Sequence, residues 1–201
     1  MGWVVIGGHA VNSQVEPPAA RRVRVDLTEL TEAFDEASWE VSTFLDLDTG
    51  EVIRITSEVR QELEAIYAEV AEEPADEESD RAAFATALKR RDPPGWMHEL
   101  LVEADAVESG LGTRFLRVPG ADSREGYEDM QAFIETVSSP WLQERLWTAI
   151  RGRGAFRRFK DVLAGAPAER ERWFAFKGDR LRQRVLAWLA DEGIEPAEGS
   201  G

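Results

Sequence analysis

The residues best suited to carry chemistry gather in one short segment, Arg151 to Asp161, where glycines lead into a run of basic and aromatic side chains. Free backbone N–H groups at a helix start attract anions, and glycine lets a ligand approach the backbone closely. Arginine adds a planar donor that grips a phosphate or carboxylate through two hydrogen bonds. The segment therefore predicts an anion site built from Gly152, Arg153, Gly154, Arg157, Arg158 and Lys160.

A helix has to hold these side chains in place. Phe156 and Phe159 fall on one helical face and are expected to anchor that helix in the core, which leaves Arg157 and Arg158 pointing outward. Trp173 follows among further basic residues and completes the candidate set, because aromatic side chains between cations suit single-stranded nucleic acid. The competing interpretation is an ordinary helical hairpin whose arginines pair with acids of the same chain.

Charge along the chain is unevenly divided. The net charge is −15, yet residues 140–190 hold 12 basic against 5 acidic side chains, whereas residues 1–139 hold 12 against 30. Such a local cationic surface attracts anions at short range although the whole molecule repels them at long range. Either an anionic partner, nucleic acid or acidic protein, or the chain's own acidic half is expected to neutralise it.

Other chemistry finds little support in the sequence. Two isolated histidines, His9 and His98, are too few for a usual metal site or nucleophilic triad. Asp46 and Asp48 flank a predicted turn and could hold a divalent ion, but no ligand series follows them and turn chemistry is the preferred explanation. We therefore predict no metal, no cofactor and no catalytic residue, and we lean against an enzyme.

Composition narrows the class of protein further. The 201 residues contain no cysteine, which excludes disulfides, zinc–thiolate sites and thiol nucleophiles. The longest apolar run, Trp3 to Gly8, is far shorter than the ~20 residues of a membrane span and lacks the features of a signal peptide. These features predict a cytoplasmic protein that does not enter a membrane.

Apolar periodicity predicts an α+β fold, with a short antiparallel hairpin in the N-terminal part and a mainly helical C-terminal half. The hairpin joins strands at 39–47 and 52–55 through a turn containing Gly50, and one face of its first strand is expected to be buried. The other expected elements are helices over 27–37, 57–71, 81–90, from 96, from 123, from 140, after 154 and at 181–193, and a strand at 113–118.

The predicted organisation is one domain over residues 23–195. A flexible arm at 1–22 precedes it, and a disordered tail at 196–201 follows it. Residues 72–80 are acidic, contain Pro74 and hold no large apolar side chain, so they are expected to form a flexible linker.

At the glycine and arginine segment the chain resembles the uncharacterised protein family UPF0158. The likeness rests on Gly152, on the run from Gly154 to Asp161, on Trp173-Phe174 and on Trp188-Leu189, and it extends over roughly residues 23–195. The resemblance implies a bacterial, cytoplasmic protein and brings no activity, cofactor or catalytic residue with it.

Three functions remain open. The first is a non-catalytic binding or regulatory module whose cationic helical face contacts an anionic partner. The second is a structural or protein-interaction module in which the basic face is neutralised by the chain's acidic half. The third is an enzyme of unrecognised type acting on a phosphorylated substrate. The sequence leaves the oligomeric state unknown.

Overall fold

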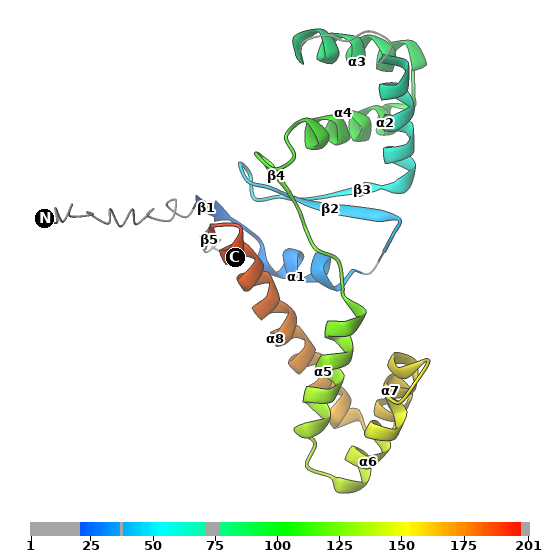
Figure 1. Ribbon diagram of the computed structural model, residues 1–201, viewed down its shortest axis with the longest axis vertical. Helices are drawn as coiled ribbons and strands as arrows, with labels where there is room; N and C mark the ends of the chain where they lie inside the picture. The colour runs from blue at the N-terminus through cyan, green and yellow to red at the C-terminus, as the bar shows by residue number, and fades with distance from the viewer. Residues whose placement is uncertain (1–20, 37, 71–76, 198–201) are drawn as a thin grey trace, which may run out of the picture.

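The computed structural model describes residues 21–36, 38–70 and 77–197, and it confirms the predicted α+β class (Figure 1). Helices and strands alternate at first, and the C-terminal half is almost wholly helical, as expected. In chain order the elements are β1 (Arg21–Arg24), α1 (Leu27–Asp35), β2 (Val41–Asp46), β3 (Val52–Thr56), α2 (Ser57–Val70), α3 (Glu77–Arg91), α4 (Gly95–Ser109), β4 (Phe115–Arg117), α5 (Ser123–Glu135), α6 (Pro140–Ala149), α7 (Ala155–Ala164), α8 (Pro167–Asp191) and β5 (Ile194–Ala197).

A three-stranded antiparallel sheet in the order β3-β2-β4 forms the middle of the molecule. The predicted hairpin β2–β3 is present, and its turn needs glycine. Gly50 has a φ of +81°, and a Cβ there would lie 1.6 Å from the carbonyl oxygen of Arg24. The turn therefore packs directly against the residue that ends β1.

The prediction that only one face of β2 is buried is wrong. Phe44 packs into a first core with α2, α3 and α4, and Leu45 packs on the other face into a second core with β1, α1, α8 and β5. Because helices cover both faces, even Ser42 and Asp46 are buried.

The two ends of the described chain lie side by side (Figure 1). β1 and β5 pair in parallel, with Arg21 opposite Ile194 and Arg24 opposite Ala197. Arg21 and Arg22 thus belong to a strand that begins two residues before the expected domain boundary, and Pro196 and Ala197 extend the last strand beyond it. Residues 1–20 and 198–201 of the predicted arm and tail lie outside the described residues.

The predicted acidic linker is helical at its end, since α3 begins at Glu77; residues 71–76 lie outside the described part of the chain.

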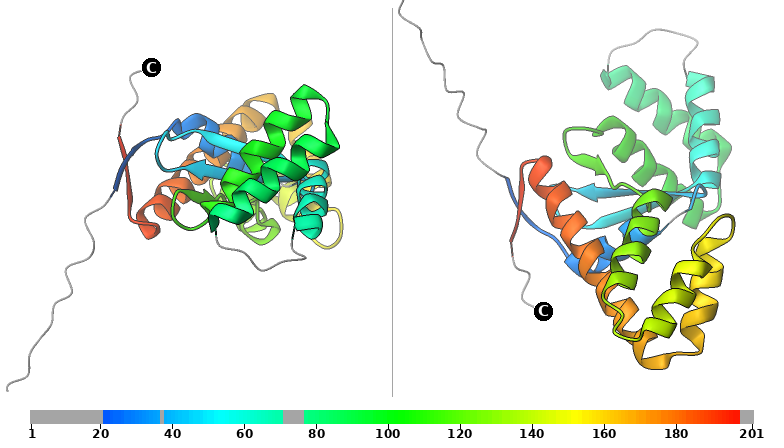
Figure 2. Two further views of the ribbon diagram at one scale, coloured as in Figure 1. Left: turned by 90° about the horizontal axis from the view of Figure 1, so that it is seen from above. Right: turned by 60° about the horizontal axis from the view of Figure 1, so that its bottom comes forward.

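A third core holds α5 to α8 together at the lower end of the molecule, where α6 and α7 lie beside the start of α8 (Figure 2). Its centre is aromatic. The ring of Trp173 meets the rings of Phe133 and Phe159 edge to face, with centroids 5.3 and 4.8 Å away. This core fixes the helical hairpin that carries the candidate site.

None of the helices in the described residues is long and apolar enough to cross a membrane.

Candidate anion-binding surface

The turn between α6 and α7 is built by its two glycines, as the sequence predicts. Gly152 and Gly154 both have a φ of +76°, a conformation that residues with a Cβ adopt only with strain. Gly154 is the residue that precedes α7, and no side chain caps that helix. Arg151 and Arg153 alternate with the glycines and are exposed on the turn.

α7 is anchored in the third core mainly by Phe159 and Leu163, which are almost fully buried. Phe156, expected to share this role, instead remains 42% exposed. Its ring lies against α5, where a Cβ on Gly126 would come within 3.1 Å of it. One phenylalanine therefore anchors the helix from inside and the other rests on the surface of a neighbouring helix.

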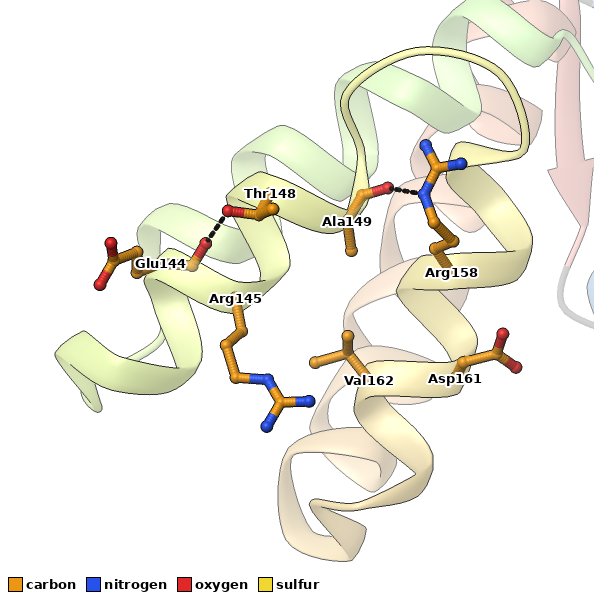
Figure 3. Close-up of a pocket in the computed structure, with 7 residues that line it drawn as sticks. All are labelled: Glu144, Arg145, Thr148, Ala149, Arg158, Asp161 and Val162. Carbon is orange, nitrogen blue, oxygen red and sulfur yellow. Dashed lines mark hydrogen bonds between the residues drawn. The ribbon is translucent and has the colours of Figure 1, made fainter.

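Arg158 does not point outward, and this part of the prediction is wrong. Its guanidinium turns back to the end of α6 and donates to the carbonyl oxygen of Ala149 at 2.9 Å (Figure 3). It also donates to the carbonyl oxygens of Arg151 at 2.6 Å, of Gly152 at 3.4 Å and of Arg153. A cation at a helix C-terminus satisfies carbonyls that have no partner within the helix. Arg158 is thus committed to closing the turn.

The remaining cations of the segment stay in solvent. Among the described residues, no carboxylate lies within ion-pair distance of Arg151, Arg153 or Lys160, and Arg157 has only Asp161 at 3.9 Å. The Arg157 and Asp161 side chains are 89% and 69% exposed, so this pair contributes little. We call these four residues, Arg151, Arg153, Arg157 and Lys160, the cationic corner.

The basic residues of α8 behave in the opposite way, since acids of the same chain neutralise several of them. Lys177 meets Asp35 of α1 at 2.5 Å, and Arg180 and Arg184 both meet Asp129 of α5, at 2.9 and 2.7 Å. Within the described part of the chain, acids therefore neutralise several basic side chains of α8, but they do not neutralise the cationic corner.

Asp129 is the centre of the α5–α8 contact. Its side chain is almost fully buried and accepts hydrogen bonds from both guanidinium groups. Burial by itself would lower the pKa of Arg184, but the hydrogen bonds to Asp129 and the neighbouring acids outweigh this effect and raise it. The Arg184 guanidinium therefore keeps its charge, and its contact with Asp129 joins two helices.

Trp173 cannot contact a partner as predicted, because only 6% of it is exposed and its ring packs in the third core. The sequence places it correctly among aromatic residues, but helical position turns it inward. The exposed aromatic residue at this point of α8 is its neighbour Phe174.

A groove of about 470 Å³ runs between α6 and α7, and the sequence reasoning missed it. Figure 3 shows Arg145 pointing between the two helices toward Val162, with Arg158 at the other end of the groove. Arg145 also lies over the ring of Trp141, 4.7 Å from its centroid. The signal that could have found Trp141 and Arg145 is their i,i+4 spacing on α6, one position before the buried Leu142 and Leu146.

The carboxylates flanking the hairpin turn are engaged by arginine. Asp46 is buried and accepts from Arg114 at 2.7 Å and from the backbone N–H of Asp48 at 2.8 Å, while Asp48 pairs with Arg21 at 2.5 Å. Burial acts to raise the pKa of Asp46, but the hydrogen bonds outweigh it and hold this pKa below its usual value. Within the described residues, no group of three possible metal ligands occurs.

Comparison with known proteins finds similarity in the second half of the chain. The model of UPF0158, described as an uncharacterised protein family, matches residues 101–200. A UPF0158 protein of Pseudomonas aeruginosa is 30% identical over 95 residues, which are 47% of this chain and 62% of the relative. The matched region thus spans less than two thirds of that relative. No solved structure matches the chain. The resemblance is confirmed over residues 101–200, and for residues 23–100 it stays a prediction.

Proposed function

We propose, from the premise that residues 101–200 are a UPF0158 region, that this chain is a non-catalytic binding module whose cationic corner contacts an anionic partner. The observation that carries the proposal is the contrast between two basic segments of one chain. Arginines and a lysine of α8 pair with acids on α1 and α5, whereas Arg151, Arg153 and Lys160 have no carboxylate within reach among the described residues.

Charge that a fold leaves uncompensated is available to an external ligand. Arg158 strengthens the local field, because its partners are carbonyl oxygens and its full positive charge remains beside the corner. Salt screens charges beyond ~8 Å at physiological ionic strength, and among the described residues Asp161 is the one carboxylate within ion-pair distance of the corner. Contact at the corner is therefore attractive once a partner has arrived.

Binding is favoured over catalysis by where these cations stand. An enzyme acting on a phosphorylated substrate would need an acid or base facing its arginines within a hollow. All four residues of the cationic corner are instead exposed on a turn and on the outer surface of a helix. The proposal places the protein in the bacterial cytoplasm, as the family resemblance implies.

The test is a binding assay on the full chain with two labelled polyanions of equal length, an oligouridylate and an oligoglutamate, at low salt. We expect at least one to bind and to dissociate steeply as salt rises. A triple variant, Arg153→Ala with Arg157→Ala and Lys160→Ala, should lose most of this affinity.

The matched control removes the same charge elsewhere, through Arg24→Ala, Lys89→Ala and Arg117→Ala, three exposed cations in β1, α3 and β4. It should bind almost as the wild type does. The proposal fails if the wild type binds neither polyanion, or if the control loses as much affinity as the corner variant.

A further inference from the structure

We infer that the anionic partner is a single-stranded nucleic acid, and that Trp141 with Arg145 is a stacking site for one of its bases. The inference rests on the proposed function, because it assigns the phosphates of the same ligand to the cationic corner. It adds two residues of α6 that the sequence reasoning had left without a role.

Trp39, Trp96 and Trp141 are all strongly exposed, and among these described residues Trp141 is the one with a guanidinium over its ring. Trp141 is 64% exposed at the start of α6, although the same helix buries Leu142 and Leu146 and the chain buries Trp173. A tryptophan gains more than other side chains from burial, so an exposed one is a candidate contact point. Its ring already carries the guanidinium of Arg145, which lies 4.7 Å from the ring centroid. The flat faces of this pair offer a surface on which a nucleobase can stack.

The groove beside this stack has the lining that a base requires. Ala149 and Val162 form apolar walls, and the guanidinium of Arg145 reaches between the helices toward Val162 (Figure 3). Glu144 and Asp161 also line the groove, but their carboxylates point away from the space between the helices (Figure 3). A flat, polarizable ligand therefore meets apolar atoms and a cation, with the acids at the rim.

The stacking site and the cationic corner lie at opposite ends of one helical hairpin. α6 has 10 residues, so about 15 Å separates Trp141 from the turn that carries Arg151 and Arg153. Stacked nucleotides advance about 3.4 Å each along one strand, so a short single strand reaches from one end to the other. Its phosphates can follow the cations while a base rests on the aromatic ring.

Stacking decides between the possible polyanions. An acidic peptide would use the cations but has no base to place on Trp141. A duplex keeps its base faces stacked on one another, so they are unavailable to a side chain unless the duplex opens. A single strand supplies both phosphates and free base faces, and aromatic side chains in such sites tolerate many sequences.

The test compares Trp141→Ala, Trp141→Phe and the matched control Trp96→Ala, an exposed tryptophan on α4, in the full chain. The probes are a labelled oligouridylate and an abasic strand of equal length. Losing one stacked base should weaken oligouridylate binding roughly 5- to 100-fold in Trp141→Ala, with an unchanged salt slope. Trp141→Phe should keep most of the affinity, and Trp96→Ala should keep all of it.

The abasic strand should bind more weakly than oligouridylate and should not distinguish Trp141→Ala from the wild type. If Trp141→Ala binds oligouridylate as the wild type does while the corner variant loses binding, the stacking site is wrong and the proposed function stands. If the wild type binds oligoglutamate but no oligonucleotide, the nucleic-acid partner is wrong and the corner remains an anion site. If the wild type binds none of the three probes, both proposals fall.

Discussion

Arg157 and Arg158 are adjacent, identical in chemistry and opposite in role. Successive residues of a helix point about 100° apart, so one guanidinium extends into solvent while the other folds back over the end of α6. The sequence predicts a basic pair but not this division, because the acceptors of Arg158 are backbone oxygens that any sequence would supply. Their position depends on the turn that Gly152 and Gly154 make.

Replacing the two arginines separately tests this division. Arg158→Ala should cost about 1–2 kcal/mol of unfolding free energy, because the carbonyls that end α6 lose a charged donor. Arg157→Ala should stay within about 0.5 kcal/mol, as is usual for an exposed side chain. Urea unfolding monitored by circular dichroism measures both. Arg158→Lys keeps the charge but lacks the fork that reaches several oxygens, so it should resemble Arg158→Ala; equal stability of the two alanine variants would contradict the assignment.

The contribution of Asp46 to the free energy of unfolding is expected to decrease at low pH. Its pKa is lower in the folded protein than in the unfolded chain, where it is about 3.9, so folding is favoured when the carboxyl is ionised. This contribution is complete above the unfolded pKa and disappears as the pH falls through the folded one. Asp46→Asn should therefore be less stable by about 1–3 kcal/mol at pH 7, and the difference should shrink below about pH 4.

Urea midpoints at pH 7 and at successively lower pH values measure this effect. Glu64→Gln, which alters an exposed carboxylate on α2, is the control and should change little at any of them. A difference between wild type and Asp46→Asn that persists undiminished in acid would rule out the ionised carboxylate as its source.

At the scale of elements, α5 and α8 are joined by a charge that neither helix could bury alone. Asp129 is almost fully buried, and Arg180 and Arg184 approach it from α8. Such a pair is retained only when its hydrogen bonds are satisfied, as they are here. The contact explains why Arg180 and Arg184 are structural although they belong to the same charged segment as the cationic corner.

Removing one member of this contact should be costly. Asp129→Asn leaves two partly buried guanidinium groups without a counter-charge, and we expect a loss of about 3 kcal/mol in unfolding free energy. Glu128→Gln, at the adjacent residue, alters an exposed pair with Arg124 and should cost less than about 0.5 kcal/mol. Thermal and urea unfolding distinguish the two. Similar losses would mean that the charge of Asp129 contributes no more to stability than the charge of a surface acid.

Elements whose signals are local could be predicted from the sequence. The hairpin around Gly50 and the helices that begin at 123 and 140 all depend on residues a few positions apart. The parallel pairing of β1 with β5 could not be predicted, because Arg21 and Ile194 lie at opposite ends of the domain. Burial of both faces of β2 was missed for the same reason: the covering helices come from distant parts of the chain.

In the candidate site, too, the features set by local sequence could be predicted and those set by packing could not. Glycine positions and the basic character of the segment were readable, since they depend on residue type. Which arginine is free and which tryptophan is exposed depends on helical phase and on neighbours. Trp173 faces Phe133 of α5, whereas Trp141 faces nothing that the sequence pattern could identify.

At the scale of the molecule, three hydrophobic cores are linked by shared elements. β2 contributes Phe44 to the first core and Leu45 to the second. α8 contributes Leu189 to the second core and Trp173 to the third. Since a rigid strand and a rigid helix each span two cores, loss of the middle core should release both ends of the molecule.

Leu189→Ala tests this coupling, because Leu189 is fully buried in the second core. Truncating such a residue should cost about 2–5 kcal/mol. If the cores unfold together, the slowest-exchanging amides of α4, in the first core, and of α7, in the third, should lose protection by that same free energy. Hydrogen exchange followed by mass spectrometry resolves the two helices, and Leu186→Ala, at a part-exposed position of α8, should leave both unchanged. Unaltered protection of α4 alongside weakened α7 would mean that the sheet insulates one end from the other. The cationic corner on the α6–α7 hairpin would then sit on a unit that opens independently of the first core.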